Sequence, residues 1–224
     1  LMRGGKLNPD FLSETADFFA GHFSLRRALI TANSTVQAAV FRESASEDVV
    51  LGDGGWLFYA DTLEDFQGTN PMTGRALFCA ARNLALLQEY CAQQGTKFLF
   101  VCAPNKNTSY PEYMPGQYRK TEQVSDLDRL EQALTQQGVS FCDLREALSG
   151  RESLTYYRTD SHWNGYGSYL AGRQILQALG KEADTEDVSL SMQQHAGDLY
   201  GMLYPASDRK EDAPAPAQLR TFSY

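Results

Sequence analysis

The chain has 224 residues, of which 42% are hydrophobic, so it can bury a substantial core and is globular rather than disordered. Its 28 acidic and 20 basic residues give a formal net charge of -8, which repels nucleic-acid backbones and excludes nucleic acid as the default partner. No apolar run approaches the roughly 18 to 20 residues that cross a bilayer.

The N-terminal segment, residues 1–45, is predicted to be helical. Apolar residues recur at spacings of three and four in two blocks, which are separated around Gly21 and His22. This pattern is typical of two amphipathic helices, which we expect to pack on the domain that follows. Because Leu1 precedes Met2, we also expect a cut end, from which an export signal or membrane anchor has been removed.

Residues 46–204 carry the pattern of an α/β domain. Apolar residues at 49–51 and 56–59 flank a glycine-rich turn, which predicts a hairpin. A long helix is expected over residues 73–94, and Gly95 is its expected stop.

The next segments alternate between strand and helix. The apolar run KFLFVCAP, residues 97–104, predicts a strand buried on both faces of a parallel sheet. A helix with Ser125 as its N-cap and Gly138 as its stop precedes a second strand at 139–144. Helix followed by strand, twice, predicts right-handed crossovers in a three-layer α/β/α domain of the flavodoxin-like class, with a mainly parallel sheet.

The last part of the chain contains one more strand and helix before an irregular tail. LTYYR, residues 154–158, predicts a third short strand, and Asn164 is a candidate cap for the helix that follows. Residues 205–224 are rich in proline, alanine and charge, which predicts a surface loop or linker.

The sequence RTDSHWNG places Asp160 and His162 two residues apart, between the third expected strand and the next helix. In a doubly wound sheet, loops at this position carry functional groups. An aspartate that accepts the Nδ1 proton of a histidine orients the ring and leaves Nε2 to take a proton from a nucleophile. The spacing therefore favours an acid and base pair, with Asp160 orienting His162.

Two alternatives for this pair stay open. Asp160 and His162 could join His195 and Asp198 as a nitrogen and oxygen ligand set for a metal, although their spacing specifies no metal. They could also be half-buried polar residues with a purely structural role.

The loop APNKNTSYPEYMP follows the first apolar strand and is predicted to form a second wall of the site. A lysine there could neutralise an oxyanion, an asparagine could donate hydrogen bonds to one, and aromatic rings could stack on sugars. The structural alternative is a turn shaped by asparagine and proline. The candidate contacts to substrate or oxyanion are Asn105, Lys106, Tyr110, Trp163 and Asn164.

Four motifs together resemble the SGNH-hydrolase-like domain of the alginate O-acetyltransferase family (AlgX and AlgJ) and the DHHW-motif proteins of Gram-positive bacteria. LGDGGWLFYAD is similar to the family's GKDGWLF motif, and APNKNTSYPEYMP is similar to its PxK loop before a tyrosine. YYRTDSHWNGYGSYLA is similar to the D-x-H-W-N block, and GDLYGML to the segment after it. The last motif gives His195 and Asp198 a structural role.

The resemblance implies a Ser-His-Asp triad in which Asp160 orients and His162 is the base. In the family the serine lies in an R-D-S-F-like block, some tens of residues after the GDL segment. No such block occurs before Tyr224, so we expect the nucleophile in an absent C-terminal segment and expect the chain as given to be inactive. Three serines lack the matching context: Ser109, Ser161 and Ser223.

The resemblance further implies acetyl transfer to hydroxyls of a polysaccharide, in the cell envelope or outside the cell, without a metal or bound cofactor. A membrane-bound O-acyltransferase would be the partner that supplies acetyl groups. Two other functions remain open: a carbohydrate-binding or scaffold relative without catalysis, and a stand-alone esterase that acts on acetylated glycans. Ser161 stands where Gram-positive relatives often carry histidine, which leaves the substrate class open.

Overall fold

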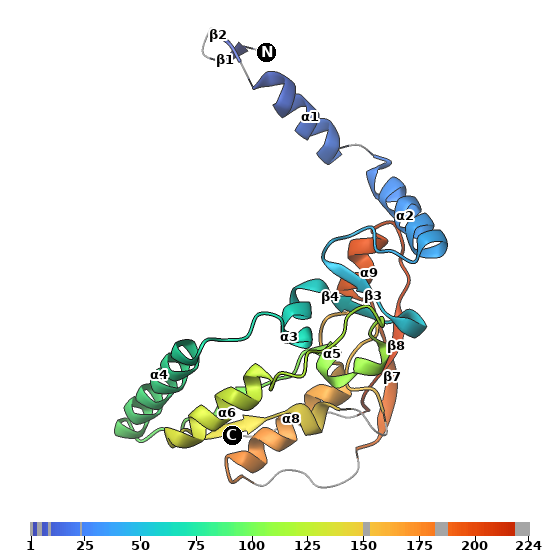
Figure 1. Ribbon diagram of the computed structural model, residues 1–224. Coiled ribbons are helices and arrows are strands. Elements are labelled where there is room, and N and C mark those ends of the chain that lie inside the picture. Colours follow the sequence, from blue (N-terminus) through green and yellow to red (C-terminus); the bar gives the residue numbers. More distant parts are fainter. Residues whose placement is uncertain are drawn as a thin grey trace.

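The computed structural model describes residues 2–3, 6–8, 10–22, 24–149, 153–181 and 188–217. A body of short strands and helices follows an N-terminal helical arm (Figure 1). The arm begins with an antiparallel pair, β1 (Met2–Arg3) and β2 (Lys6–Leu7). Among the described helices, none combines the length and apolarity that a membrane span requires.

The arm contains the two helices that the apolar spacing predicts, α1 (Phe11–His22) and α2 (Arg26–Val36). A single π-helical turn over residues 37–41 extends α2. The Arg27 guanidinium donates to the Pro205 carbonyl oxygen, which ties α2 to the body. In contrast, α1 points away from the body (Figure 1), so the expected packing on the domain is wrong for α1.

The predicted hairpin is present as β3 (Val49–Leu51) and β4 (Leu57–Tyr59). Its turn includes Gly54 and Gly55, which both have positive φ, at 63° and 82°, a conformation that glycine adopts without steric cost. Alternate residues of the hairpin face two different clusters. Val49 and Leu57 pack on α9 (Asp198–Leu203), whereas Val50 and Phe58 enter the main core.

The cap predicted at Ser125 is confirmed, and the structure adds a cap at Thr73 for a second long helix. The Thr73 hydroxyl accepts from the third residue of α4 (Gly74–Gln93), and the Ser125 hydroxyl accepts from the third residue of α6 (Asp126–Gln136). Short helical turns connect the other elements: Ala60–Thr62, α3 (Leu63–Gln67), α5 (Lys106–Ser109), Pro111–Tyr113 and α7 (Arg145–Leu148).

The parallel part of the fold is one pair of strands, β5 (Phe100–Cys102) and β6 (Phe141–Asp143), with Val101 opposite Cys142. The other three strand pairs of the described chain are antiparallel. All three residues of β5 are half-buried, so the prediction of burial on both faces is wrong. Within the described residues, β5 has a strand neighbour on one edge, and its side chains are correspondingly less covered.

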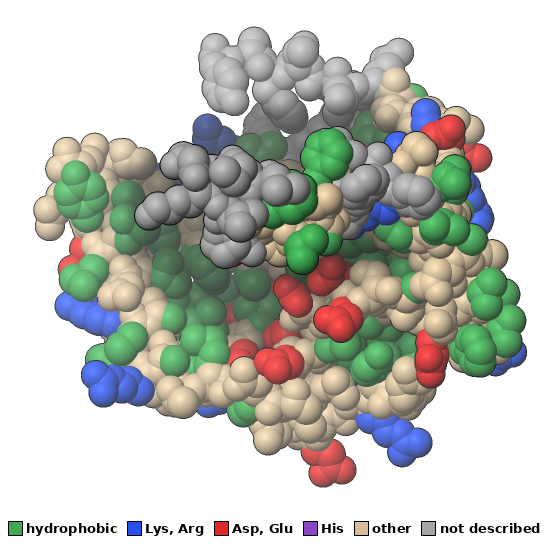
Figure 2. Space-filling model, turned by 90° about the horizontal axis from the view of Figure 1, so that it is seen from above, with side chains coloured by type: hydrophobic (Ala, Val, Ile, Leu, Met, Phe, Trp, Pro, Cys, Tyr) green, Lys and Arg blue, Asp and Glu red, His purple; other side chains and the backbone are tan. Residues whose placement is uncertain are grey.

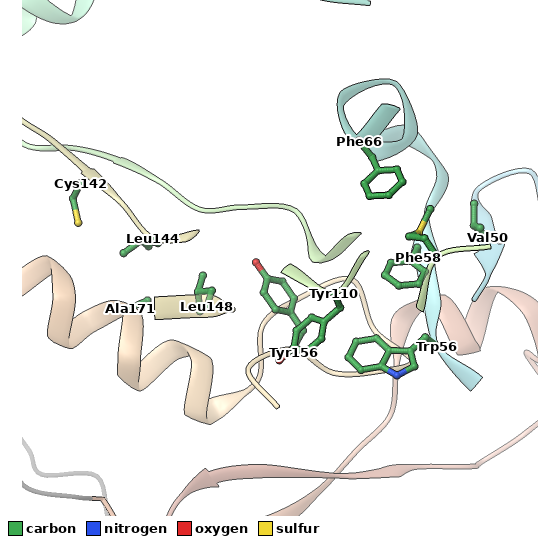
Figure 3. Close-up of a cluster of buried hydrophobic side chains, with 11 residues drawn as sticks. Val50, Trp56, Phe58, Phe66, Tyr110, Cys142, Leu144, Leu148, Tyr156 and Ala171 are labelled. Carbon is green, nitrogen blue, oxygen red and sulfur yellow. The ribbon is translucent and has the colours of Figure 1, made fainter. Parts of the chain in front are cut away.

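The main core joins the β3–β4 hairpin to β6 and α8 (Gly165–Ala178). Figure 3 shows Tyr110 and Tyr156 in the middle of this core, between Trp56, Phe58 and Phe66 on one side and Leu144 and Leu148 on the other. The rings of Trp56 and Tyr110 lie 4.6 Å apart, so aromatic packing links the two halves of the domain. On another face, acidic side chains gather beside a hollow with many hydrophobic side chains (Figure 2).

The prediction of a third strand at LTYYR, residues 154–158, is wrong. Tyr156 makes an isolated antiparallel bridge with Trp163, and the backbone between them turns back as a loop. Asn164 does cap α8, because its side-chain oxygen accepts from the Gly167 N–H at 2.9 Å. The residues after this loop are therefore helical as expected.

The tail prediction is also wrong over residues 211–216. There β8 (Glu211–Pro216) pairs antiparallel with β7 (Leu190–His195), and its last four residues are buried. Proline lacks an N–H for the ladder, which is why this composition predicts a loop, but an edge strand tolerates it. An added Cβ at Gly165 would lie 2.6 Å from the Ala215 Cβ, so the tail packs tightly on α8.

Candidate active site

Asp160 is the centre of the candidate site and is 4% exposed. Its Oδ1 accepts from the backbone N–H and from Nδ1 of His162, at 2.9 and 2.8 Å. Its Oδ2 accepts from Nε2 of His195 at 2.7 Å and from the backbone N–H of Asp198 at 3.0 Å. The predicted pairing of Asp160 with His162 is thus present in the geometry that a triad requires.

These hydrogen bonds keep Asp160 ionised. Burial alone would raise the pKa of this carboxyl, but the bonds from His195, His162 and Asp198 outweigh burial and lower the pKa to about 2. Asp160 is therefore negatively charged at neutral pH, and its charge favours a proton on the facing nitrogen of each histidine.

His162 projects from this fixed carboxylate toward solvent, with 75% of its side chain exposed. Because Nδ1 is bound to Asp160, Nε2 is the nitrogen that can exchange a proton with a substrate or nucleophile. The ring lies at a cavity of about 330 Å³. The lining residues include Tyr59, Thr62, Asn105, Ser161, His162 and Trp163.

Lys106 holds the loop of residues 157–164 (the site loop) from inside the body of the protein. Its side chain is buried, and the residue is 5% exposed. Its ammonium donates to the carbonyl oxygens of Tyr157, Arg158 and Asp160, at 3.1, 3.2 and 2.6 Å. Burial lowers the pKa of Lys106 to about 7 against the opposing effect of Glu211, while three carbonyl acceptors favour the ammonium form. Lys106 also lines the cavity at His162, and its contact to an oxyanion stays a prediction, which would require the ammonium to release one of these carbonyl oxygens.

Glu211 of β8 holds the same loop from the other side. Its carboxylate accepts from the backbone N–H groups of Arg158 and Thr159, at 2.9 and 2.8 Å. Glu211 was not among the predicted site residues, because it lies in a tail whose composition predicts a loop. An acidic residue at the start of an alternating stretch is the only signal that could have suggested it.

The GDL segment, residues 197–199, supports the site loop, because its backbone lies very close to that of Thr159. An added Cβ at Gly197 would lie 2.2 Å from the Thr159 carbonyl oxygen, so only glycine fits there. The next residue, Asp198, accepts from the backbone N–H of Ser161 at 2.7 Å. The structural role that the resemblance implies for Asp198 agrees with these contacts.

The remaining predicted contacts divide into two groups. Asn105 and Trp163 line the cavity, although the Asn105 amide also donates to Asp65 at 2.9 Å. Tyr110 is 3% exposed and its hydroxyl is bonded to Thr155, so its predicted contact with substrate is wrong. The same holds for Asn164, which is 1% exposed and whose amide caps α8 and donates to backbone carbonyls.

Of the three serines without the family context, the two described ones make no hydrogen bond to Nε2 of His162. The Ser161 hydroxyl is 3.2 Å from Nδ1 of His162, the nitrogen that is bound to Asp160, and it donates to Asp198. The Ser109 hydroxyl is buried without a hydrogen-bond partner among the described atoms. Ser223 lies outside the described residues.

The metal alternative draws on the same residues. Ligand atoms of Asp160, His162 and Asp198 lie within 4.8 Å of one another. However, Nδ1 of His162 and Nε2 of His195 both lie at hydrogen-bonding distance from the Asp160 carboxylate. Because a carboxylate only accepts, each of these nitrogens carries a proton and donates a hydrogen bond to it. Acid and base chemistry uses this arrangement directly, whereas a metal bound by Nδ1 of His162 would have to displace the proton on that nitrogen.

We expect Gly197→Ala to destabilise the protein by about 2 kcal/mol or more, because the new methyl group overlaps the Thr159 carbonyl oxygen. Chemical denaturation measures the change. Gly201→Ala in α9 is the matched control, since an added Cβ there meets no atom within 4 Å and alanine favours the helix. Equal stability of the two variants would contradict the close approach.

A buried aspartate hydrogen-bonded to an exposed histidine at the edge of an α/β domain is the arrangement that serine hydrolases and acyltransferases use for acid and base chemistry. The chain belongs to the family described as "SGNH hydrolase-like domain, acetyltransferase AlgX", whose sequence model matches residues 49–224. The SGNH-hydrolase-like α/β class is thereby confirmed.

Individual relatives agree with this membership. The chain is 25% identical over 186 residues to the probable alginate O-acetylase AlgJ of Pseudomonas syringae pv. tomato, covering 80% of this chain and 45% of that protein. The O-acetyltransferase domain of Pseudomonas putida AlgJ superposes with a TM-score of 0.50 at 23% identity, covering 75% of this chain and 63% of that one. Pseudomonas aeruginosa AlgX gives 0.55 at 15% identity, covering 74% and 43%. The two structures show the shared fold, and the chain spans less than half of the curated relative.

Proposed function

We propose that the full-length protein transfers acetyl groups to hydroxyls of a polysaccharide, with His162 as general base and Asp160 as the residue that orients it. The 2.8 Å hydrogen bond between Asp160 Oδ1 and His162 Nδ1 carries this proposal, because it leaves Nε2 free to exchange protons at the cavity. Membership of an acetyltransferase family supports the reaction type.

The reaction runs in two displacements. First, Nε2 of His162 takes the proton of a serine hydroxyl as the serine oxygen attacks the acetyl carbonyl, and it returns that proton to the departing group of the donor. The product is an acetyl-serine. Then Nε2 takes the proton of a sugar hydroxyl, whose oxygen attacks the acetyl carbon, and returns it to the serine oxygen. In the family that the motifs resemble, this serine follows the GDL segment in an R-D-S-F-like block.

We further propose a polysaccharide acceptor, a location and a partner for this reaction. The relative's name, alginate O-acetylase, supports a polysaccharide acceptor and a location in the cell envelope or outside the cell. A membrane-bound O-acyltransferase would bring acetyl groups to this site. Trp163 and Asn105, which line the cavity, are the side chains we assign to acceptor contacts.

Acetyl transfer from p-nitrophenyl acetate, with and without an oligosaccharide acceptor, tests the function of the full-length protein. We expect acetylated oligosaccharide in the presence of acceptor, and mass spectrometry detects it. Free acetate as the sole product would identify an esterase, because water and sugar use the same acyl intermediate. Sugar binding without acetyl release would identify a binding relative. Activity that EDTA abolishes would favour the metal alternative.

A further inference from the structure

Asp160 is shared by two histidines. Each carboxylate oxygen accepts two hydrogen bonds, one from a histidine ring and one from a backbone N–H. A carboxylate has about four acceptor positions, so all of them are occupied and neither oxygen is free to turn. The reaction proposed above uses His162 and assigns no task to His195.

His195 is fixed independently of Asp160. It is the last residue of β7, where it lies opposite Glu211 of β8. Its ring stacks on Tyr157, with the ring centroids 3.8 Å apart and the planes at 15°. The side chain of His195 is 33% exposed, compared with 75% for His162. One histidine is therefore anchored by a strand and an aromatic ring, while the other projects into the cavity.

We propose that His195 is a positioning residue for His162 and acts through Asp160. The N–H at Nε2 of His195 holds Oδ2 of Asp160 in place. Oδ1 of Asp160 is therefore directed at the ring of His162, and the proton of His162 stays on Nδ1. The lone pair of His162 then stays on Nε2, where the base needs it. The proposal rests on the proposed function for its purpose, but the geometry that it claims can be tested without substrate.

Other charged or ionisable groups face this pair without replacing His195. Lys106 contacts the backbone carbonyl of Asp160, and Asp198 offers its backbone N–H to Oδ2. Tyr157 stacks on the ring of His195, and Glu211 lies opposite His195 in the strand register, with its carboxylate bonded to the backbone of Arg158 and Thr159. Among the described residues, His195 is the one whose side chain donates to Oδ2.

Nitrogen NMR of the full-length protein with ¹⁵N-labelled histidine tests the proposal directly. In the wild type we expect the proton of His195 on Nε2 and that of His162 on Nδ1, with a low-field N–H resonance for the latter. His195→Phe keeps a ring against Tyr157 and removes the donor. We expect this variant to lose the single His162 tautomer and to lower kcat by about 10-fold at unchanged KM.

His195→Gln supplies an N–H at a similar distance along the side chain and is expected to restore the His162 signal and most of kcat. A wild-type spectrum with the His195 proton on Nδ1 would overturn the proposal, even if His195→Phe does not fold. So would an unchanged His162 signal in a folded His195→Phe. Because the spectra need no substrate, a protein without acetyltransferase activity can still show the expected tautomers, which separates failure of the proposed function from failure of the positioning role.

Discussion

Replacing His162 by alanine in the full-length protein is expected to lower acetyl transfer at least about 10³-fold, because the proposed mechanism assigns both proton transfers to this side chain. The melting temperature is expected to change by a few degrees at most. The side chain is 75% exposed, and Asp160 Oδ1 keeps its hydrogen bond from the backbone N–H of residue 162. Initial rates with p-nitrophenyl acetate and thermal denaturation measure the two quantities.

Ser168→Ala is the matched control, because it changes an exposed polar side chain on α8, close in sequence to His162. We expect this control to keep both activity and stability. Wild-type turnover in His162→Ala would remove His162 from the mechanism, whereas a large loss of stability would make the activity change uninformative for catalysis.

Asp160→Asn is expected to lower kcat by about 10³- to 10⁴-fold, with a nearly isosteric side chain. An amide offers one acceptor oxygen in place of two, so it cannot accept from both histidines, and its NH₂ group favours the wrong tautomer at one of them. The pH profile of kcat/KM reports the change. A wild-type profile in this variant would show that Asp160 does not act on the base.

The same variant changes how stability depends on pH. The folded pKa of Asp160 is about 2, below the ordinary aspartate value of 3.8, so its contribution is present above pH 4 and is lost as pH falls through 2. This contribution is about 2 kcal/mol. Urea denaturation at pH 6 and pH 2.5 should therefore show a smaller drop in unfolding free energy for Asp160→Asn than for the wild type.

Local sequence signals predicted much of this fold and the centre of the site. Ser125 and Asn164 are short polar residues before apolar periodic segments, and each accepts a backbone N–H as the predicted cap. The pairing of Asp160 with His162 also follows from local spacing, since both residues lie on one short loop.

The contacts that hold the site loop were not predicted, because they join residues far apart in the sequence. Lys106 contacts a loop 51 to 54 positions away, and Glu211 contacts the same loop from 52 and 53 positions away. No periodicity encodes such contacts. Composition also misled the prediction for β8, because alanine and proline disfavour strands in general, yet this strand is stabilised by its partner β7 and by α8.

The contacts of Lys106 and Glu211 with the site loop matter for protein engineering. The loop owes its backbone conformation to an ammonium from α5 and a carboxylate from β8, so the DSHW sequence does not encode the site by itself. Transplanting residues 157–164 into another α/β scaffold would move the acid and base but leave their supports behind. A functional graft would have to carry Lys106, Glu211 and the glycine before Asp198 as well, which makes this site a unit of tertiary structure rather than a portable motif.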